Sequence, residues 1–206
     1  MFPRQLGFSG IFESLKNKSL LGEIKSNSLY NVGLYCSNLD GDFAELGCHW
    51  GGTSFLLASI LKPPHKIYAF DSFEGLPKSV EQDEFNLPEG YLIADYDWVK
   101  QYLSAHNERV NINSKVELYK GWIEDTLINI KDKSLSLIHV DLDLYAPTKF
   151  AIQTLWDQLV SGGFMVFDDY KWNSTPGVKI AVDEFFGDLF GYNHYYIECQ
   201  LGVMKI

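Results

Sequence analysis

Residues 42–53 read DFAELGCHWGGT, and this stretch decides the fold class of the 206-residue chain. Residues 42–46 form a short run typical of a strand, and the glycines that follow are typical of a tight turn that opens a helix. Residues 53–61 (TSFLLASIL) are apolar on nearly every side, which predicts a helix buried against a sheet and ended by Pro63. A strand, a glycine-rich turn and a buried helix together indicate an α/β fold.

The same alternation of strand and helix continues along the chain. Further strands are predicted at 66–70, 116–119, 135–140 and 164–167, and helices at 28–37, 98–105, 123–130, 148–159 and 178–186. Two last strands, at 194–199 and 202–206, are joined by a tight turn. This pattern favours right-handed crossovers and an open, mainly parallel seven-stranded sheet with helices on both faces and a C-terminal antiparallel hairpin.

The composition indicates a single globular domain over residues 1–206. The chain is 46% hydrophobic and 21% charged, and it contains no apolar run near the roughly 20 residues that a membrane helix needs. We expect a helical N-terminal segment at 1–40. Residues 78–98 are acidic, rich in turn residues and without clear periodicity, which predicts a lid or insert.

Charge and cysteine content exclude several classes of partner. The formal net charge is −10 and no basic stretch stands out, so we expect neither a nucleic acid nor a membrane as partner. The three cysteines contain no CxxC pair, which argues against a zinc site or a disulfide framework. Residues 1–12 lack the apolar stretch of a signal peptide, so we expect a cytoplasmic protein.

Ligands of open α/β sheets bind beyond the carboxyl ends of the strands, and polar residues gather at these positions in the sequence. The glycine-rich turn 47–52 lets the backbone approach a ligand closely, although a turn without a ligand remains an alternative. Asp71 follows the second strand, where a carboxylate can accept hydrogen bonds from ribose hydroxyls of an adenosyl or a nicotinamide donor. Gly121 and Trp122 follow the third strand, where an adenine could rest, although Trp122 could equally belong to the core.

Four aspartates follow the fourth and fifth predicted strands. Asp141 and Asp143 come after the fourth strand, and Asp168 and Asp169 after the fifth. Neighbouring strands lie about 5 Å apart, so the carboxylates should converge and repel one another unless a cation lies among them. Oxygen ligands suit Mg²⁺ or Ca²⁺ better than zinc. The alternative is that Asp143 and Asp169 cap the helices that follow.

Six blocks of sequence carry a resemblance to a known family: GDFAELGCHWGGTS (41–54), FDSFEGLP (70–77), GWIEDTL (121–127), DLDLYAPT (141–148), FDDY (167–170) and AVDEF (181–185). Together they resemble the macrocin and mycinamicin (TylF-like) O-methyltransferases, which methylate sugar hydroxyls on macrolides and related products with the help of a metal ion. The resemblance covers about 41–186 and implies the class I methyltransferase (Rossmann-like) fold.

The resemblance implies the following site. The donor S-adenosylmethionine would be bound by the glycine turn and the next two strand ends, through Glu45, Gly47, Cys48, His49, Trp50, Gly51, Thr53, Ser54, Asp71, Ser72, Phe73, Gly121 and Trp122. Mg²⁺, with Mn²⁺ able to substitute, would be bound by Asp141, Asp168 and Asp169, and Asp141 would be the catalytic base. The acceptor would be a hydroxyl of a sugar, a glycosylated metabolite or another small natural product, and a homo-oligomer is left open.

Some residues depart from the family pattern. Trp50 stands where the family has an arginine, and DLDLYAPT stands where the family has DGDLYEST. His49 competes with Asp141 as the base, although a lone histidine beside Trp50 is more often a packing residue. A non-catalytic relative and an antibiotic hydroxylase therefore remain alternatives. A nicotinamide-dependent oxidoreductase is disfavoured because the turn is not GxGxxG.

Overall fold

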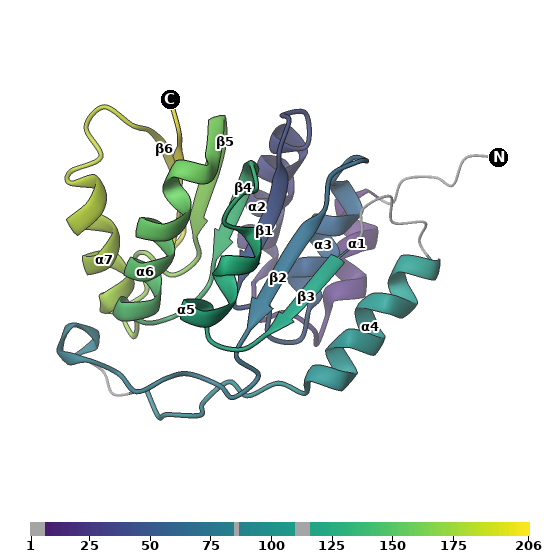
Figure 1. The fold of residues 1–206 in the computed structure, drawn as a ribbon, viewed down its shortest axis with the longest axis horizontal. Helices are drawn as coiled ribbons and strands as arrows, with labels where there is room; N and C mark the ends of the chain where they lie inside the picture. The colour runs from purple at the N-terminus through teal and green to yellow at the C-terminus, as the bar shows by residue number, and fades with distance from the viewer. Residues whose placement is uncertain (1–6, 85–86, 110–115) are drawn as a thin grey trace.

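The strands form one seven-stranded sheet in the order β3-β2-β1-β4-β5-β7-β6 (Figure 1). This computed structural model describes residues 7–84, 87–109 and 116–206. The first five strands are parallel, and β7 pairs antiparallel with both β5 and β6. The strands are β1 (Asp42–Leu46), β2 (Ile67–Asp71), β3 (Val116–Lys120), β4 (Leu135–Val140), β5 (Leu159–Phe167), β6 (Asn193–Ile197) and β7 (Gln200–Met204).

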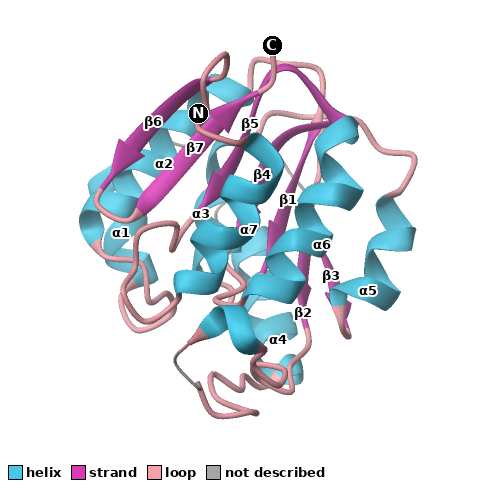
Figure 2. Ribbon diagram, turned by 90° about the vertical axis from the view of Figure 1, so that its left-hand side faces the viewer, coloured by secondary structure: helices cyan, strands magenta, loops and turns pink. Residues whose placement is uncertain are grey.

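Helices cover both faces of the sheet, as Figure 2 shows with α1 and α3 on one side and α5 and α6 on the other. Side chains of alternate strand residues point to opposite faces of the sheet. Phe43 packs in the core under α1, α2, α3 and α4, whereas Ala44 packs in the core under α5, α6 and α7. The helices are α1 (Phe8–Leu15), α2 (Glu23–Cys36), α3 (Gly52–Ile60), α4 (Tyr96–Arg109), α5 (Ile123–Thr126), α6 (Tyr145–Leu155) and α7 (Pro176–Phe186), with 3₁₀ turns η1 (Glu81–Asp83), η2 (Leu127–Ile130) and η3 (Trp156–Gln158).

The order of the strands reverses between β1 and β4, and this reversal positions the site. The chain runs from β1 outwards to β2 and β3, and then returns to place β4 on the other side of β1. Loops that leave β1 and β4 therefore diverge at their carboxyl ends and open a crevice there.

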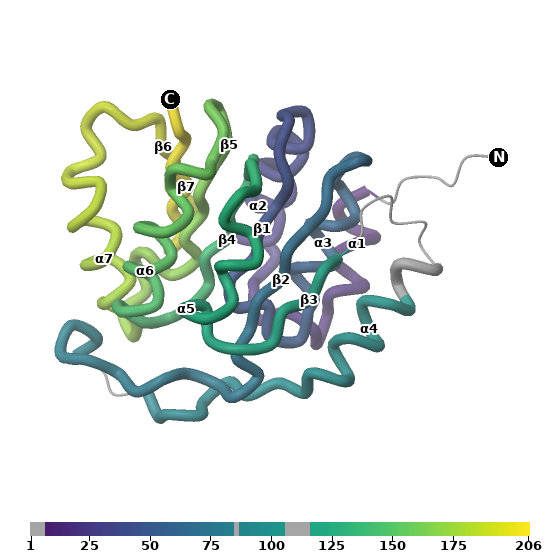
Figure 3. The backbone as a smooth tube through the Cα atoms, viewed as in Figure 1, coloured from purple at the N-terminus to yellow at the C-terminus, as the bar shows by residue number. Residues whose placement is uncertain are grey.

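The segment between β2 and α4, which contains the predicted insert 78–98, runs along the edge of the sheet where the parallel strands end (Figures 1 and 3). It is anchored through buried Asp83, whose carboxylate accepts hydrogen bonds from the backbone N–H of Val80 at 2.8 Å and of Tyr145 at 2.7 Å. The N–H of Leu76 also donates to the carbonyl of Tyr91 at 2.8 Å. The segment thus lies over the strand ends, and its motion as a lid stays a prediction.

Several elements differ from the sequence-based expectation. The N-terminal segment contains two helices, α1 and α2, and α2 begins at Glu23 rather than at residue 28. The helix expected at 123–130 divides into α5 and η2, and the one expected at 148–159 is α6, which begins at Tyr145 and ends at Leu155. Among the helices of the described ranges, none combines the length and apolar character needed to cross a membrane.

Candidate active site

A cavity of about 1320 Å³ opens where the parallel strands end. Its wall includes one or more residues that end or follow each of the five parallel strands: Gly47, Asp71, Gly121, Asp141, Asp143, Asp168 and Asp169. Pockets for a single small ligand usually measure about 300–1,000 Å³. The cavity therefore has room for two small molecules side by side.

The glycine turn begins in a backbone conformation that favours glycine. Gly47 has a φ of +89°, and a Cβ atom there would lie 1.8 Å from the carbonyl oxygen of Asp141. The backbone of the β1 turn therefore lies directly against the end of β4. This close approach brings the turn and the aspartates of β4 to the same cavity.

Asp71 is held in place at the end of β2. Its carboxylate accepts hydrogen bonds from the backbone N–H groups of His49 and Phe73, each at 2.8 Å. Burial raises the pKa of Asp71, and the two N–H groups oppose this rise. Each carboxylate oxygen has a second lone pair, so Asp71 can still accept hydrogen bonds from a ligand.

The structure brings most, but not all, of the predicted donor residues to the cavity. Those that line it are Gly47, Cys48, His49, Thr53, Asp71, Ser72, Gly121 and Trp122.

Five of the predicted donor residues, Glu45, Trp50, Gly51, Ser54 and Phe73, are not among the cavity-lining residues. Gly51 has no side chain, and the other four side chains have partners outside the cavity wall. The indole of Trp50 meets that of Trp98 with ring centres 5.3 Å apart, and buried Phe73 packs against Tyr96 at 5.2 Å. Glu45 is completely buried and accepts a hydrogen bond from Ser54. These five residues lie outside the cavity wall, and their role at the donor stays a prediction.

His139 was not predicted, and it occupies the centre of the sheet next to Glu45. It is completely buried on β4, with Nδ1 3.4 Å from Glu45 Oε1 and Nε2 3.9 Å from Asp168 Oδ1. Burial lowers the pKa of His139, but the two carboxylates outweigh burial and raise it to about 10. His139 therefore lies between two carboxylates, both of which favour its charged form. Its only sequence signal is a histidine inside an apolar strand, at the position that pairs with Glu45.

Three aspartates converge at the ends of β4 and β5. Asp141, Asp143 and Asp169 each offer one oxygen, and these oxygens lie within 4.8 Å of one another. Burial and the neighbouring carboxylates raise the pKa of Asp141 well above its ordinary value and that of Asp143 to about 7. Burial and Asp168 also raise the pKa of Asp169. The cluster is therefore short of positive charge.

Helix capping does not explain the cluster. The residue that precedes α6 is Leu144 and the one that precedes α7 is Thr175, and neither Asp143 nor Asp169 occupies a cap position. Asp143 instead has a φ of +60°, a left-handed conformation in which its side chain joins those of Asp141 and Asp169. Non-glycine residues in this region often mark functional sites.

Asp168 was predicted to act with Asp141 and Asp169, but its carboxylate has other partners. It forms an ion pair with the ammonium of Lys25, and its Oδ1 accepts a hydrogen bond from Gln200 Nε2 at 3.1 Å. Burial opposes ionisation, yet His139 and Lys25 outweigh it and lower the pKa of Asp168. Lys25 comes from α2 and also lies 3.7 Å from Asp169 Oδ1. The sequence-based prediction missed this lysine because it lies far away along the chain.

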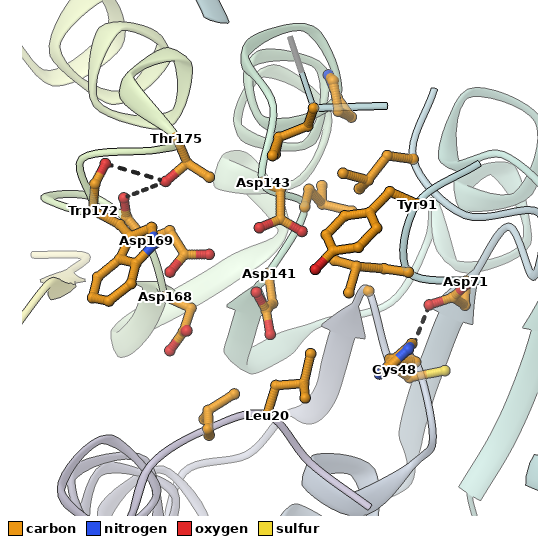
Figure 4. Close-up of a pocket in the computed structure, with 18 of the residues that line it drawn as sticks. Leu20, Cys48, Asp71, Tyr91, Asp141, Asp143, Asp168, Asp169, Trp172 and Thr175 are labelled. Carbon is orange, nitrogen blue, oxygen red and sulfur yellow. Dashed lines mark hydrogen bonds between the residues drawn. The ribbon is translucent and has the colours of Figure 1, made fainter. Parts of the chain in front are cut away.

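Two aromatic side chains stand on opposite sides of the aspartates, Tyr91 from the predicted insert and Trp172 from the turn after β5 (Figure 4). Both are about half exposed, at 52% and 56%. Leu20, Leu76 and Leu87 extend this part of the wall. The cavity thus combines a polar floor with apolar sides, which suits a ligand that carries hydroxyl groups on an apolar body.

A seven-stranded sheet with a terminal antiparallel hairpin, a glycine turn after β1 and an acidic residue at the end of β2 defines the class I methyltransferase fold. Solved structures agree with this fold. The O-methyltransferase NovP superposes with a TM-score of 0.77 at 22% identity, covering 91% of this chain and 82% of that chain. The calicheamicin methyltransferase CalS11 superposes with a TM-score of 0.74 at 20% identity, covering 96% of this chain and 90% of that chain.

Sequence similarity identifies the family to which the chain belongs. The model of the macrocin-O-methyltransferase (TylF) family matches residues 27–188, and the chain belongs to this family. A tetracenomycin rhamnosyl 4′-O-methyltransferase of Streptomyces olivaceus is 30% identical over 139 residues, which is 63% of this chain and 53% of that protein. The mycinamicin III 3″-O-methyltransferase of Micromonospora griseorubida is 27% identical over 155 residues, which is 70% of this chain and 60% of that protein. The chain thus matches little more than half the length of these curated relatives.

Proposed function

We propose that this chain is an S-adenosylmethionine-dependent O-methyltransferase that acts on a hydroxyl of a sugar or of another small natural product. Its family and fold support methyl transfer. The observation that carries the proposal is a single cavity lined both by the turn held against Asp71 and by the aspartates of β4 and β5. The similarity to a tetracenomycin rhamnosyl 4′-O-methyltransferase and to mycinamicin III 3″-O-methyltransferase supports a glycosylated acceptor.

The donor would lie at the ends of β1, β2 and β3. Asp71 would accept hydrogen bonds from the ribose hydroxyls, the backbone of 47–49 would surround the methionine part, and Gly121 and Trp122 would contact the adenine. Because two backbone N–H groups already orient Asp71, little reorganisation is needed on binding.

A divalent cation fits the aspartates. Asp141, Asp143 and Asp169 supply closely spaced oxygens in a site short of positive charge, a donor set that suits Mg²⁺ or Mn²⁺. When bound there, the ion would lower the pKa of an acceptor hydroxyl. Asp141 would accept the hydroxyl proton at a carboxylate oxygen. The acceptor oxygen would then bond to the methyl carbon as the sulfur–methyl bond breaks, which would give a methyl ether and S-adenosylhomocysteine.

Correct orientation of the acceptor hydroxyl toward the donor would supply much of the rate enhancement of methyl transfer, because the attacking oxygen must lie in line with the sulfur–methyl bond that breaks. The shared cavity places the donor turn and Asp141 side by side, since Gly47 touches the backbone of Asp141. Tyr91 and Trp172 would hold the apolar part of the acceptor between them.

The test is methyl transfer from deuterium-labelled S-adenosylmethionine, with Mg²⁺ present, to a panel of rhamnosides with apolar aglycones. Mass spectrometry should detect a labelled methyl group on at least one acceptor, and Asp141→Asn should remove it. An unmodified panel, together with tight binding of S-adenosylhomocysteine, would favour the alternative of a non-catalytic relative that only binds the donor.

A further inference from the structure

Asp83 is a buried carboxylate that lies outside the donor turn and outside the aspartates of β4 and β5. It belongs to η1 of the predicted insert and is 2% exposed. Its Oδ2 accepts a hydrogen bond from the N–H of Val80 at 2.8 Å, and its Oδ1 accepts one from the N–H of Tyr145, the first residue of α6, at 2.7 Å. The carboxylate thus joins the insert to the start of α6.

The start of α7 lies against the same carboxylate. Gly177 is the second residue of α7, and a Cβ atom there would lie 2.1 Å from Asp83 Oδ1 and 2.9 Å from the backbone nitrogen of Tyr145. The first turns of α6 and α7 therefore meet at Asp83, with no room for a side chain between them. Because the N-terminus of a helix carries partial positive charge, both helices stabilise a carboxylate at this point.

Asp83 also takes the place of a local cap on α6. Helices often begin with a residue whose side chain accepts a hydrogen bond from the first turn, but Leu144, which precedes α6, cannot do so. The Asp83 carboxylate, which comes from a distant part of the chain, supplies this hydrogen bond instead. Asp143 is therefore not needed as a cap, and with its φ of +60° its carboxylate lies with those of Asp141 and Asp169.

The start of α7 is likewise tied to the aspartates that follow β5. Thr175 precedes α7 and is 3% exposed, and its Oγ1 donates a hydrogen bond to the carbonyl of Asp169 at 3.4 Å (Figure 4). On the other side, Asp143 lies close before the first residue of α6 along the chain. Asp83 is thus linked to the loop after β4 by the start of α6 and to the loop after β5 by the start of α7.

We propose that Asp83 is a positioning residue of this methyltransferase. Its carboxylate holds the first turns of α6 and α7 together and thereby fixes the distance between the aspartates after β4 and those after β5. The inference rests on the proposed function, in which these aspartates act on the acceptor hydroxyl. Asp83 itself is not among the residues that line the cavity, so it acts through the two helices and not by contact with a ligand.

Two pairs of variants test the inference. Asp83→Asn keeps one acceptor oxygen and Asp83→Ala keeps none, so the loss should grow from the first to the second. Tyr145→Pro removes the N–H that donates to Asp83, whereas Tyr145→Ala removes the same ring and keeps the N–H. Proline fits the first position of a helix, and Leu144 has the extended φ of −119° and ψ of 156° that suit a residue before proline. Ser79→Ala, which removes a hydrogen bond within the insert to the Leu87 carbonyl, is the control.

The kinetic measurement is methyl transfer to an acceptor of the rhamnoside panel, with binding of S-adenosylhomocysteine measured on the same samples. Asp83→Ala should lower kcat roughly ten- to a hundred-fold, because a misplacement of about 1 Å near the reacting groups can cost this much. Asp83→Asn should lie between Asp83→Ala and the wild type, and Tyr145→Pro should lower kcat further than Tyr145→Ala. Binding of S-adenosylhomocysteine should stay within about three-fold of the wild type, because the donor residues lie at other strands.

Hydrogen exchange provides a second readout that does not need activity. In Asp83→Ala, peptides that cover the first turns of α6 and α7 should both exchange faster than in the wild type, although the hydrogen bond from the helices to Asp83 comes from α6. Ser79→Ala should leave the exchange of both turns unchanged. Faster exchange in α7 as well as α6 is the result expected if one carboxylate holds the two helices together.

A wild-type kcat in Asp83→Ala, equal kcat in Tyr145→Pro and Tyr145→Ala, or faster exchange confined to α6 would overturn the inference. Should Asp83→Ala also lose S-adenosylhomocysteine binding, Asp83→Asn decides: a loss of donor binding there as large as the loss of kcat would show that Asp83 supports the fold as a whole and would overturn the inference too. If the wild-type chain transfers no methyl group to any acceptor, the proposed function fails, and exchange at the start of α7 decides whether Asp83 holds the two helices.

Discussion

Asp71 is the residue on which donor binding should depend most, because two backbone N–H groups hold its carboxylate at the end of β2. Asp71→Ala removes a charge-assisted contact to the ribose. We expect this to weaken S-adenosylmethionine binding by about 1.5–3 kcal/mol, roughly ten- to a hundred-fold in affinity. Calorimetry measures the change, and Asp132→Ala in an exposed turn is the matched control. Equal affinities of the two variants would show that Asp71 does not contact the donor.

Asp141 should matter more for turnover than Asp169. Both would contact the cation, but only Asp141 would also accept the proton, a role worth on the order of 10²–10⁴ in rate. Asp141→Asn should therefore lower kcat further than Asp169→Asn at saturating Mg²⁺. Steady-state methyl transfer with the same acceptor compares the two variants. A larger loss in Asp169→Asn would assign the proton to another group, such as His49.

Gly47 should be intolerant of any side chain. Gly47→Ala would hold an alanine in the left-handed backbone conformation, which costs about 1–3 kcal/mol of stability. Its Cβ atom would also overlap the carbonyl oxygen of Asp141. Gly191→Ala is the matched control, because Gly191 has a similar φ of +96° and nothing within 4 Å of its Cβ position. The free energy of unfolding should fall more for Gly47→Ala than for Gly191→Ala. Similar losses would mean that the turn can move away from β4.

The sequence predicted the residues of the site that follow strands but not those that reach it from elsewhere. Asp71 is the last residue of β2, Asp141 directly follows β4, and Asp169 is the second residue after β5, and positions at the ends of apolar strands can be recognised in the sequence. Lys25 and His139 carry no such mark: Lys25 meets Asp168 through tertiary packing of α2, and His139 lies within a strand. The grouping of Asp143 with Asp141 depends on its left-handed backbone, which a sequence pattern does not specify.

At the scale of elements, the strands with the clearest pattern were predicted best. The strand expected at 135–140 is β4 with those bounds, because every residue of it is buried. β5 was expected at 164–167 but begins at Leu159, and Gly162 and Gly163 lie in an irregular part of the strand. The sequence analysis did not predict α1 as a helix separate from α2, because α1 is short and its N-cap residue makes no side-chain hydrogen bond.

The insert 78–98 should close over the cavity when both ligands are present. Its attachment through Asp83 to the start of α6 gives it a fixed pivot, and Tyr91 within it lines the cavity. Hydrogen exchange of the amides in 78–84 and 87–98 should slow on addition of S-adenosylhomocysteine and acceptor. Asp83→Ala should raise exchange there without ligand, because two backbone hydrogen bonds are lost. Exchange that is unchanged by ligands would contradict the lid.

For the whole molecule, the topology would separate donor binding from metal binding. β1, β2 and β3 carry the residues proposed to bind the donor, and β4 and β5 carry the aspartates, on either side of the reversal in strand order. Removal of metal with EDTA should therefore abolish methyl transfer but leave S-adenosylhomocysteine binding within about three-fold of its value with Mg²⁺. Activity and calorimetry on the same sample provide the comparison. Full activity after exhaustive chelation would exclude a catalytic cation.

The most direct measurement is a calorimetric titration of the wild-type chain with S-adenosylhomocysteine and, separately, with NADH. The turn at Gly47 departs from the dinucleotide pattern and leads to Asp71, so we predict that one equivalent of S-adenosylhomocysteine binds and that NADH gives no heat of binding. Binding of NADH without binding of S-adenosylhomocysteine would contradict the account.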